Sequence, residues 1–157
     1  MQISELLLPE RIACQRQGSS KKRALEELAR LLAGALPDFN DGEIFESLIS
    51  RERLGSTGLG RGVALPHGRL KGLKAPVAAL LTLQQGVDFD AIDGQPVDLL
   101  FALLVPDEST DEHLQILARL AEMFSDVDFC RQLRNCRDSA QCHELISRWD
   151  SRQQLTA

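Results

Sequence analysis

The chain has 157 residues, of which 43% are hydrophobic and 26% are charged, and its formal net charge at pH 7 is −5. This length suits one domain with its own core, and the composition is that of a folded protein, not a disordered one. There is no apolar run of about 18 residues and no charged-then-apolar leader, which disfavours a membrane span and a secretory signal. The negative charge disfavours nucleic-acid binding. We expect a soluble cytoplasmic protein with one domain over residues 1–157 and a core over about 5–150.

The N-terminal part predicts one amphipathic helix after an opening segment of weak pattern. Residues 1–12 indicate at most a short strand or a turn. Ser19 or Ser20 can then cap a helix over residues 21–36, because leucines recur there every three to four residues and form one apolar stripe. Pro37 cannot continue a helix, so we expect the helix to end before it.

A second helix is predicted over residues 42–53. Asn40 and Glu43 have the spacing of a capping box, in which each side chain bonds to a free amide at the start of the helix. Arg51 falls in the last turn, where a positive charge suits the helix dipole.

After this helix the apolar pattern becomes that of strands. Residues 63–66 and 75–83 predict strands, and residues 96–106 form an apolar run bounded by prolines, as in a strand buried on both faces. The pair Asp93-Gly94 between the last two predicts a hairpin turn. We therefore expect an α/β fold: a single domain with a mixed (parallel and antiparallel) sheet and helices on both faces.

The C-terminal part predicts two further helices. Ser109 and Glu112 have capping-box spacing at the start of a helix over residues 109–124. A final helix is expected over residues 138–149, and residues 150–157 are expected to form a frayed tail.

Neither the cysteines nor the acidic residues predict a metal site. Three of the four cysteines recur at six-residue intervals, which matches neither a CxxC pair nor a zinc-ligand spacing, so we expect reduced thiols. The acidic residues after the second strand are too far apart for a calcium loop and are expected to be solvated. These residues are Cys14, Cys130, Cys136 and Cys142, and Asp88, Asp90, Asp93 and Asp98.

Glycines alternate in the stretch that follows the second helix. Gly58, Gly60 and Gly62 fit neither a dinucleotide-binding fingerprint nor a P-loop. They would let the backbone approach a ligand closely or adopt positive φ, and successive amides in such a turn can bind an anion. With Ser56 and Thr57 they are candidate phosphate-binding residues, and the alternative is that they are ordinary turn glycines.

The sequence "GVALPHG" places His67 in a constrained setting within a basic segment. Residues 51–74 hold six basic residues against one acidic residue, a net charge of +5, so the rest of the chain carries −10. Pro66 fixes its own φ and holds Leu65 extended, so His67 follows the strand at a fixed angle, with Gly68 behind it. A neutral imidazole is a nucleophile, and attack on phosphorus needs nearby positive charge. Candidate cations are Arg51, Arg53, Arg61 and Arg69.

The other two histidines lie in the predicted C-terminal helices. His113 falls in the first turn of its helix, where the dipole disfavours protonation and attracts anions, and it borders the apolar face. A partly buried core histidine is the alternative for this residue. His143 shows no chemistry in its surroundings and is expected at the surface.

The run "RERLGSTGLGRGVALPHGRL" resembles the phosphorylation-site motif of the enzyme IIA domains of the bacterial phosphotransferase system, in the mannitol/fructose class and most closely in its nitrogen-regulatory branch. The similarity covers about residues 5–150. It implies a mixed sheet flanked by helices and a phosphotransferase component without a cofactor. It also implies that His67 accepts a phosphoryl group on Nε2, with Arg51 and His113 as its partners.

The resemblance further implies partners. The donor would be an HPr-like phosphocarrier of the nitrogen-related system (NPr), and the regulated targets would be proteins such as potassium-transport or sensor-kinase components. The chain shows no IIB cysteine domain and no membrane IIC segment, which favours a regulator. Two alternatives stay open at this point: a sugar-specific IIA that passes phosphate to a IIB cysteine, and a binding module that has the fold without the chemistry.

Overall fold

Side-chain caps begin the two helices that the sequence predicts in the N-terminal half. The structure, a computed structural model, describes residues 2–108 and 110–156. Helix α2 (Lys21–Ala33) begins at Ser20, whose side chain accepts from the Arg23 amide, and it ends before Gly34, earlier than predicted. Helix α3 (Asp41–Glu52) begins at Asn40 with the complete capping box.

The opening segment has more structure than the sequence predicts. A short helix α1 (Ile3–Leu6) and a 3-10 turn η1 (Pro9–Arg11) precede strand β1 (Ile12–Arg16). The amides of Ile3 and Ser4 donate to the carboxylate of Asp150, at 3.1 and 2.8 Å. A partner from the other end of the chain therefore holds the start of α1, which explains why local sequence gives no sign of it.

The sheet is mixed, as predicted. It contains β2 (Gly58–Gly60), β3 (Val63–Ala64), β4 (His67–Leu70), β5 (Val77–Val87) and β6 (Val97–Pro106) beside β1. The order is β1-β5-β6-β3-β2, and β4 also pairs with β6. Strands β5 and β6 are antiparallel, as are β2 and β3, whereas β1 runs parallel to β5 and both β3 and β4 run parallel to β6.

Strands β3 and β4 are two parts of one line of pairing along β6. Val63 lies opposite Leu99 and His67 lies opposite Leu103, so the register is the same before and after the break. The break falls at Pro66, which has no amide hydrogen to donate to a ladder. Its carbonyl still accepts from the Leu103 amide, at 2.9 Å. The backbone around His67 is therefore held by the central part of the sheet.

Three helices follow the sheet in the described chain: α4 (Thr110–Phe124), α5 (Val127–Asn135) and α6 (Ser139–Thr156). The predicted cap at Ser109 lies outside the described residues. Helix α5, capped by Asp126, is absent from the sequence prediction. The prediction of a frayed tail is wrong for residues 150–156, which continue α6, because no glycine or proline interrupts the helix there.

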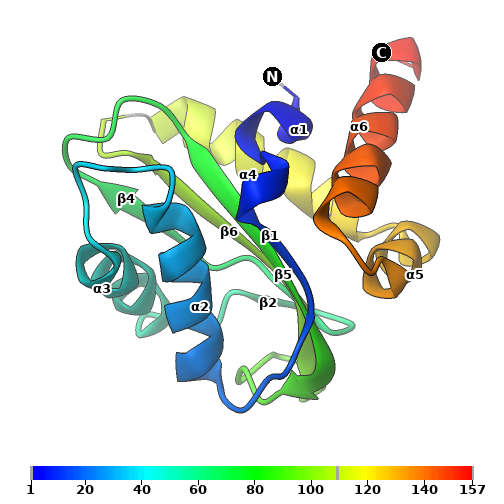
Figure 1. Ribbon diagram of the computed structural model, residues 1–157, viewed down its shortest axis with the longest axis horizontal. Coiled ribbons are helices and arrows are strands. Elements are labelled where there is room, and N and C mark those ends of the chain that lie inside the picture. Colours follow the sequence, from blue (N-terminus) through cyan, green and yellow to red (C-terminus); the bar gives the residue numbers. More distant parts are fainter. Residues whose placement is uncertain (1, 109, 157) are drawn as a thin grey trace.

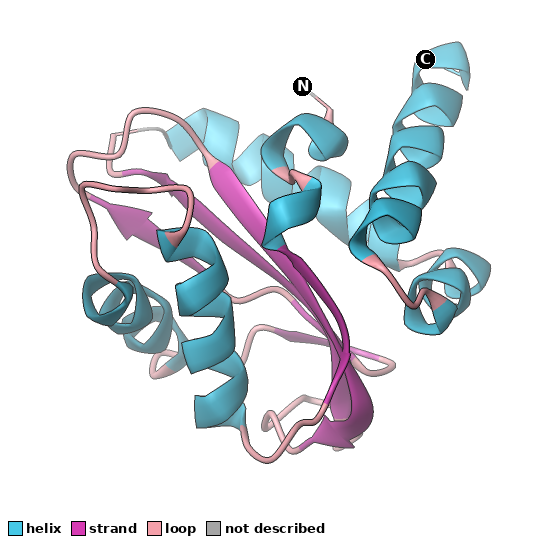
Figure 2. Cartoon of the chain, in the orientation of Figure 1, coloured by secondary structure: helices cyan, strands magenta, loops and turns pink. Residues whose placement is uncertain are grey.

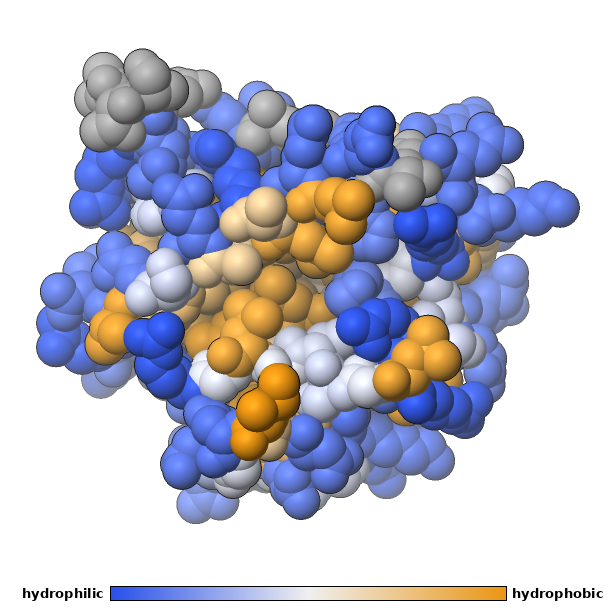
Figure 3. Space-filling view, turned by 180° about the vertical axis from the view of Figure 1, so that it is seen from behind, coloured by the Kyte–Doolittle hydropathy of each residue, from blue (hydrophilic) through white to orange (hydrophobic). Residues whose placement is uncertain are grey.

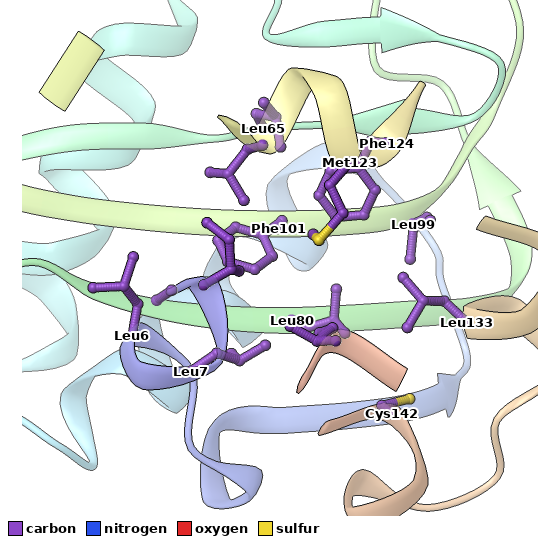
Figure 4. Packing of buried hydrophobic residues seen from close by; sticks show 14 of the residues in the cluster. Leu6, Leu7, Leu65, Leu80, Leu99, Phe101, Met123, Phe124, Leu133 and Cys142 are labelled. Atoms are coloured by element: carbon purple, nitrogen blue, oxygen red, sulfur yellow. The ribbon is translucent and has the colours of Figure 1, made fainter. Parts of the chain in front are cut away.

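Helices cover both faces of the sheet, as Figures 1 and 2 show: α2 and α3 lie on one face, and α4, α5 and α6 lie on the other. Alternate residues of β6 contribute to the two cores, with Phe101 in one and Ala102 in the other. Figure 4 shows Phe101 packed among residues of the α4–α6 side. This burial on both faces confirms the prediction for residues 96–106. From behind, Figure 3 shows apolar side chains gathered in a hollow ringed by hydrophilic residues.

Candidate functional site

His67 is the first residue of β4, immediately after the break at Pro66. Its Nδ1 lies 2.8 Å from the carbonyl oxygen of Leu65. Because a carbonyl oxygen only accepts, Nδ1 carries the hydrogen of this bond, and the neutral ring then has its lone pair on Nε2. The backbone thus fixes both the orientation and the tautomer of the imidazole.

The ring of His67 is held in its neutral form. Partial burial lowers the pKa of His67, and the positive charge of Arg51 lowers it further, although the bond to Leu65 and the charge of Glu52 act in the opposite sense. A pKa below the usual value of about 6.5 leaves the imidazole uncharged at neutral pH. Nε2 is then a nucleophile without the loss of a proton.

His113 lies beside His67. The centroids of the two rings are 5.4 Å apart, and the ring planes meet at 71°, edge to face. His113 is 7% exposed, and neither of its ring nitrogens has a hydrogen-bond partner among the described residues. Burial lowers the pKa of His113, with smaller contributions from His67 and Arg69. A buried imidazole without partners can donate a hydrogen bond to a group that enters beside His67.

A cavity of about 1080 Å³ contains both histidines and Arg51. The guanidinium of Arg51 donates from Nη1 to the carbonyl oxygen of Gly55 at 2.8 Å, which ties it to the turn after α3. Arg69 and Lys71 also line this cavity. Of the four cations that the sequence suggested, Arg51 and Arg69 therefore reach the site, whereas Arg53 and Arg61 do not line it.

The turn after α3 is fixed by a buried carboxylate that sequence reasoning missed. Glu52 is 5% exposed and accepts from both the amide and the hydroxyl of Thr57. Lys21 of α2 pairs with the same carboxylate at 2.9 Å. Glu52 thus joins α2, α3 and the turn that holds Arg51, so it is a positioning residue for the site. The spacing of Glu52 and Thr57 gives no motif, and Lys21 is distant in sequence.

The glycine-rich stretch lies beside the cavity wall and does not line it. Gly58 and Gly60 are in β2, and no residue from 56 to 62 is among the described residues that line the cavity. The amide of Thr57 bonds to Glu52, and that of Gly58 bonds to the Ser56 hydroxyl at 3.1 Å. Ser56, Thr57, Gly58, Gly60 and Gly62 therefore do not line the cavity that holds His67, although the Thr57 carbonyl oxygen accepts from the Leu65 amide at 3.0 Å. Positive φ at Gly60 and Gly62, 93° and 81°, accounts for two of the glycines.

Gly68, next to His67, is required by close packing. A Cβ on Gly68 would lie 3.0 Å from the Ser47 carbonyl oxygen and would overlap the Ser47 hydroxyl. That hydroxyl donates to the carbonyl oxygen of Arg69 at 3.0 Å. Helix α3 thus rests directly on β4, which brings Arg51 to the same cavity as His67.

Other sequence expectations need correction. His143 is partly buried, and its Nε2 lies 3.1 Å from the Ser4 carbonyl oxygen, so it joins α6 to α1 instead of lying free at the surface. Asp93 accepts from the Arg61 amide at 2.8 Å, and Asp98 pairs with Arg134 at 2.8 Å, so these acids are not merely solvated. No group of three or more metal-ligating side chains occurs within residues 2–108 and 110–156.

Comparison with known proteins shows the family of this chain. Residues 5–149 match the family described as phosphoenolpyruvate-dependent sugar phosphotransferase system, EIIA 2. The chain belongs to this family. The resemblance seen in the sequence is thereby confirmed, and so is its implication that this EIIA type-2 chain is a component of a phosphotransferase system.

Relatives of this EIIA type-2 chain include nitrogen regulatory proteins. That of Pseudomonas aeruginosa is 45% identical over 146 residues, which cover 93% of this chain and 95% of that protein. That of Escherichia coli is 42% identical over 153 residues, covering 94% and 90% respectively. The crystal structure of nitrogen regulatory protein IIA-Ntr from Neisseria meningitidis has a TM-score of 0.86 at 40% identity, covering 92% of this chain and 98% of that one. In the described part of this chain, no helix is long and apolar enough to cross a bilayer.

Proposed function

We propose that this protein is a phosphorelay regulator of the nitrogen-related phosphotransferase system, in which His67 accepts a phosphoryl group from an HPr-like phosphocarrier. The observation that carries this proposal is the bond from His67 Nδ1 to the Leu65 carbonyl oxygen. It leaves Nε2 as the nitrogen with a free lone pair, in a cavity shared with Arg51 and His113.

The transfer step follows from this geometry. Nε2 of His67 attacks the phosphorus of the carrier's phosphohistidine, the new N–P bond forms, and the carrier's N–P bond breaks as its imidazole leaves. The proton stays on Nδ1, which donates it to the Leu65 carbonyl oxygen throughout. Arg51 and His113 would stabilise the charge on the transferring oxygens, because preorganised donors in a partly buried site act on charge that develops in the transition state.

A protein partner suits the surroundings of the cavity. Leu54, which lines it, is 84% exposed, and Leu114, next to His113, is 62% exposed. Exposed apolar side chains beside a reactive group favour transient contact with another protein. The cations Arg51, Arg69 and Lys71 add an attraction for the phosphoryl group that such a carrier presents.

The regulatory role is favoured over sugar transport by the relatives, since near-full-length matches above 40% identity, those of Pseudomonas aeruginosa and Escherichia coli among them, are named nitrogen regulatory proteins. A phosphoryl group on His67 adds negative charge at an exposed opening, and this change in charge would alter which proteins bind there. The proposal includes a location of this protein in the cytoplasm. It also includes regulated targets such as potassium-transport or sensor-kinase components.

The test is phosphoryl transfer from a phosphorylated HPr-like carrier of the nitrogen system, followed by intact mass under conditions that preserve phosphohistidine. We expect one phosphoryl group on the wild-type chain and none on His67→Gln. His113→Gln should still be labelled, at a rate lower by roughly a hundredfold to a thousandfold, the range for loss of one transition-state donor.

His143→Gln is the matched control, since His143 lies outside the cavity. This variant should be labelled at the wild-type rate. Phosphoryl uptake that survives unchanged in a folded His67→Gln variant would falsify the proposal. Onward transfer to a sugar-specific IIB cysteine at a rate similar to uptake would favour the sugar-transport alternative.

A further inference from the structure

A pair of thiols lies on the side of the sheet covered by α6. Sγ of Cys14 on β1 and Sγ of Cys142 on α6 are 3.2 Å apart, although 128 positions separate them in sequence. Both cysteines are free. We propose that they form an oxidation site, in which a peroxide oxidises Cys14 and Cys142 then closes a reversible disulfide that ties α6 to β1. This inference does not depend on the proposed function.

The backbone of β1 explains how Cys14 reaches both α6 and solvent. Alternation along the strand places Ile12 and Cys14 toward the α6 side, whereas Ala13 faces the other core. The register of β1 on β5 then shifts between Ala13 and Arg16, with Gln15 at a φ of 52°. Irregularities of this kind re-aim neighbouring side chains. Cys14 is accordingly only partly buried, so a small oxidant can reach it.

Cys142 is placed to be the second thiol and not the first. It is fully buried near the start of α6, and Figure 4 shows it at the edge of the apolar cluster. A disulfide has an S–S bond of about 2.0 Å, so the two sulfurs must approach by about 1.2 Å. Both lie near irregular backbone, the shifted register of β1 and the segment between α5 and α6, where such a small movement is feasible.

The electrostatics assign the same roles. The hydrogen bond with Cys142 lowers the pKa of Cys14, with Arg16 acting in the same sense, while burial and Asp138 oppose them. That hydrogen bond, together with burial, raises the pKa of Cys142. The thiolate is the form that attacks a peroxide, so Cys14 reacts first.

Cys136, the third thiol in this region, does not compete. It is fully buried, burial raises its pKa, and its Sγ donates to the Gln132 carbonyl oxygen at 3.3 Å. Cys136 also interacts with Cys142. A Cys136–Cys142 disulfide is therefore the alternative product that the experiment must distinguish from the proposed Cys14–Cys142 disulfide.

The chemistry needs a hydroperoxide as oxidant. The Cys14 thiolate attacks one peroxide oxygen and the O–O bond breaks, so that Cys14 becomes a sulfenic acid; the hydroxide that leaves takes up the proton released by the Cys14 thiol and becomes water. Sγ of Cys142 then attacks the sulfur of Cys14, the S–O bond breaks, and a second water leaves with the Cys142 proton. The two thiols lose two electrons in total, and one hydrogen peroxide becomes two waters. A dithiol such as dithiothreitol reverses the step by exchange.

The experiment treats the full chain with a slight excess of hydrogen peroxide, blocks the remaining thiols and maps peptides without reduction. We expect a Cys14–Cys142 link, an intact mass lower by two hydrogen atoms, and full reversal by dithiothreitol. The oxidised protein should also melt several degrees higher, because the link closes a long loop in the unfolded chain.

Two variants separate the roles of the thiols. Cys142→Ala should leave Cys14 as a sulfenic acid that dimedone traps, whereas Cys14→Ser should neither form the link nor react with dimedone. Cys130→Ala is the matched control, since Cys130 is a buried thiol that bonds to the Phe124 carbonyl oxygen at 3.3 Å; it should form the link like wild type. Because Cys14 is only partly buried, Cys14→Ser remains informative if Cys142→Ala fails to fold.

Three results would overturn the proposal: a Cys136–Cys142 link as the main product, stepwise over-oxidation of Cys14 without a link, or no reaction at Cys14 under conditions that oxidise free cysteine. None of these results bears on phosphoryl transfer to His67. Failure of the thiol proposal is therefore distinguishable from failure of the proposed function.

Discussion

The two faces of the sheet contribute unequally to the candidate site. The face covered by α2 and α3 supplies Arg51, the turn that holds it, and the contact of α3 with β4 beside His67. The face covered by α4, α5 and α6 supplies His113 to the same cavity, and its core contains the thiols. Most of the site geometry therefore depends on the layer formed by α2 and α3. The other layer contributes the imidazole of His113 to the cavity wall.

Each layer contains one buried carboxylate that joins distant elements. Glu52 joins α2, α3 and the turn next to the site, and Asp150 joins α6 to the start of α1 and pairs with Arg119 of α4 at 3.2 Å. Both carboxylates have side chains that are 1% exposed. They are matched in burial and in pairing but differ in their relation to the cavity, so they offer the sharpest test of this comparison.

The largest effects are expected from Glu52→Ala and Asp150→Ala. Each removes one partner of a buried ion pair and leaves amides without an acceptor, so each should lower the free energy of unfolding by about 3–5 kcal/mol. Only Glu52→Ala should also slow phosphoryl transfer, by roughly tenfold to a hundredfold, because Arg51 loses its fixed turn. Urea denaturation and the carrier assay measure the two effects. Equal transfer rates in the two variants would contradict the division between the layers.

A smaller effect is expected from Gly68→Ala. The new Cβ meets the backbone of Ser47, so α3 must move away from β4 at a cost of about 1–3 kcal/mol in the free energy of unfolding. Transfer to His67 should slow as well, since His67 and Arg51 would move apart. Gly34→Ala, at the end of α2, is the matched control: its Cβ would lie 3.4 Å from the Leu31 carbonyl oxygen and its backbone is helical, so stability should change little.

The smallest effect is a dependence of stability on pH. The pKa values of His67 and His113 are lowered in the folded state, mainly by burial, so the unfolded chain binds protons more readily. The free energy of unfolding should therefore fall as pH drops below about 6.5, the value for an unperturbed histidine, and should be insensitive to these groups above it. The loss levels off once the pH is below the folded pKa values.

Denaturation between about pH 8 and pH 5 measures this dependence, above the range in which carboxylates titrate. A variant with both His67→Gln and His113→Gln should lose most of the slope. His143→Gln, which removes a histidine outside the cavity, should retain it. A wild-type slope of the opposite sign would show that the two rings are protonated in the folded state.

The sequence was sufficient for elements whose signals are local. Ser20, Asn40 and Glu43 mark the starts of α2 and α3, and the apolar runs mark β5 and β6. Helix α5 was missed because it is short and its cap, Asp126, has no partner glutamate three residues on. Strand β4 was missed because "HGRL" is only partly apolar and forms a strand through its pairing with β6.

The same distinction holds for the site. The local context of Pro66 predicted a rigid setting for His67, and residue types suggested Arg51 and His113, which the structure brings to one cavity. The role of Glu52 depends on Lys21, and the Cys14–Cys142 pair depends on two ends of the chain meeting. No spacing in the sequence encodes such contacts. The glycines, by contrast, gave a local pattern whose explanation is backbone conformation beside the cavity.

The unbroken register of β3 and β4 on β6 has a consequence for how the site could evolve. Main-chain pairing to the innermost strand, and not the surrounding side chains, sets the location of the imidazole. Residues around the opening can therefore vary, and with them the set of proteins that dock, while the reactive nitrogen keeps its coordinates. The protein could then acquire different signalling partners without any change in the position of the nitrogen that accepts the phosphoryl group.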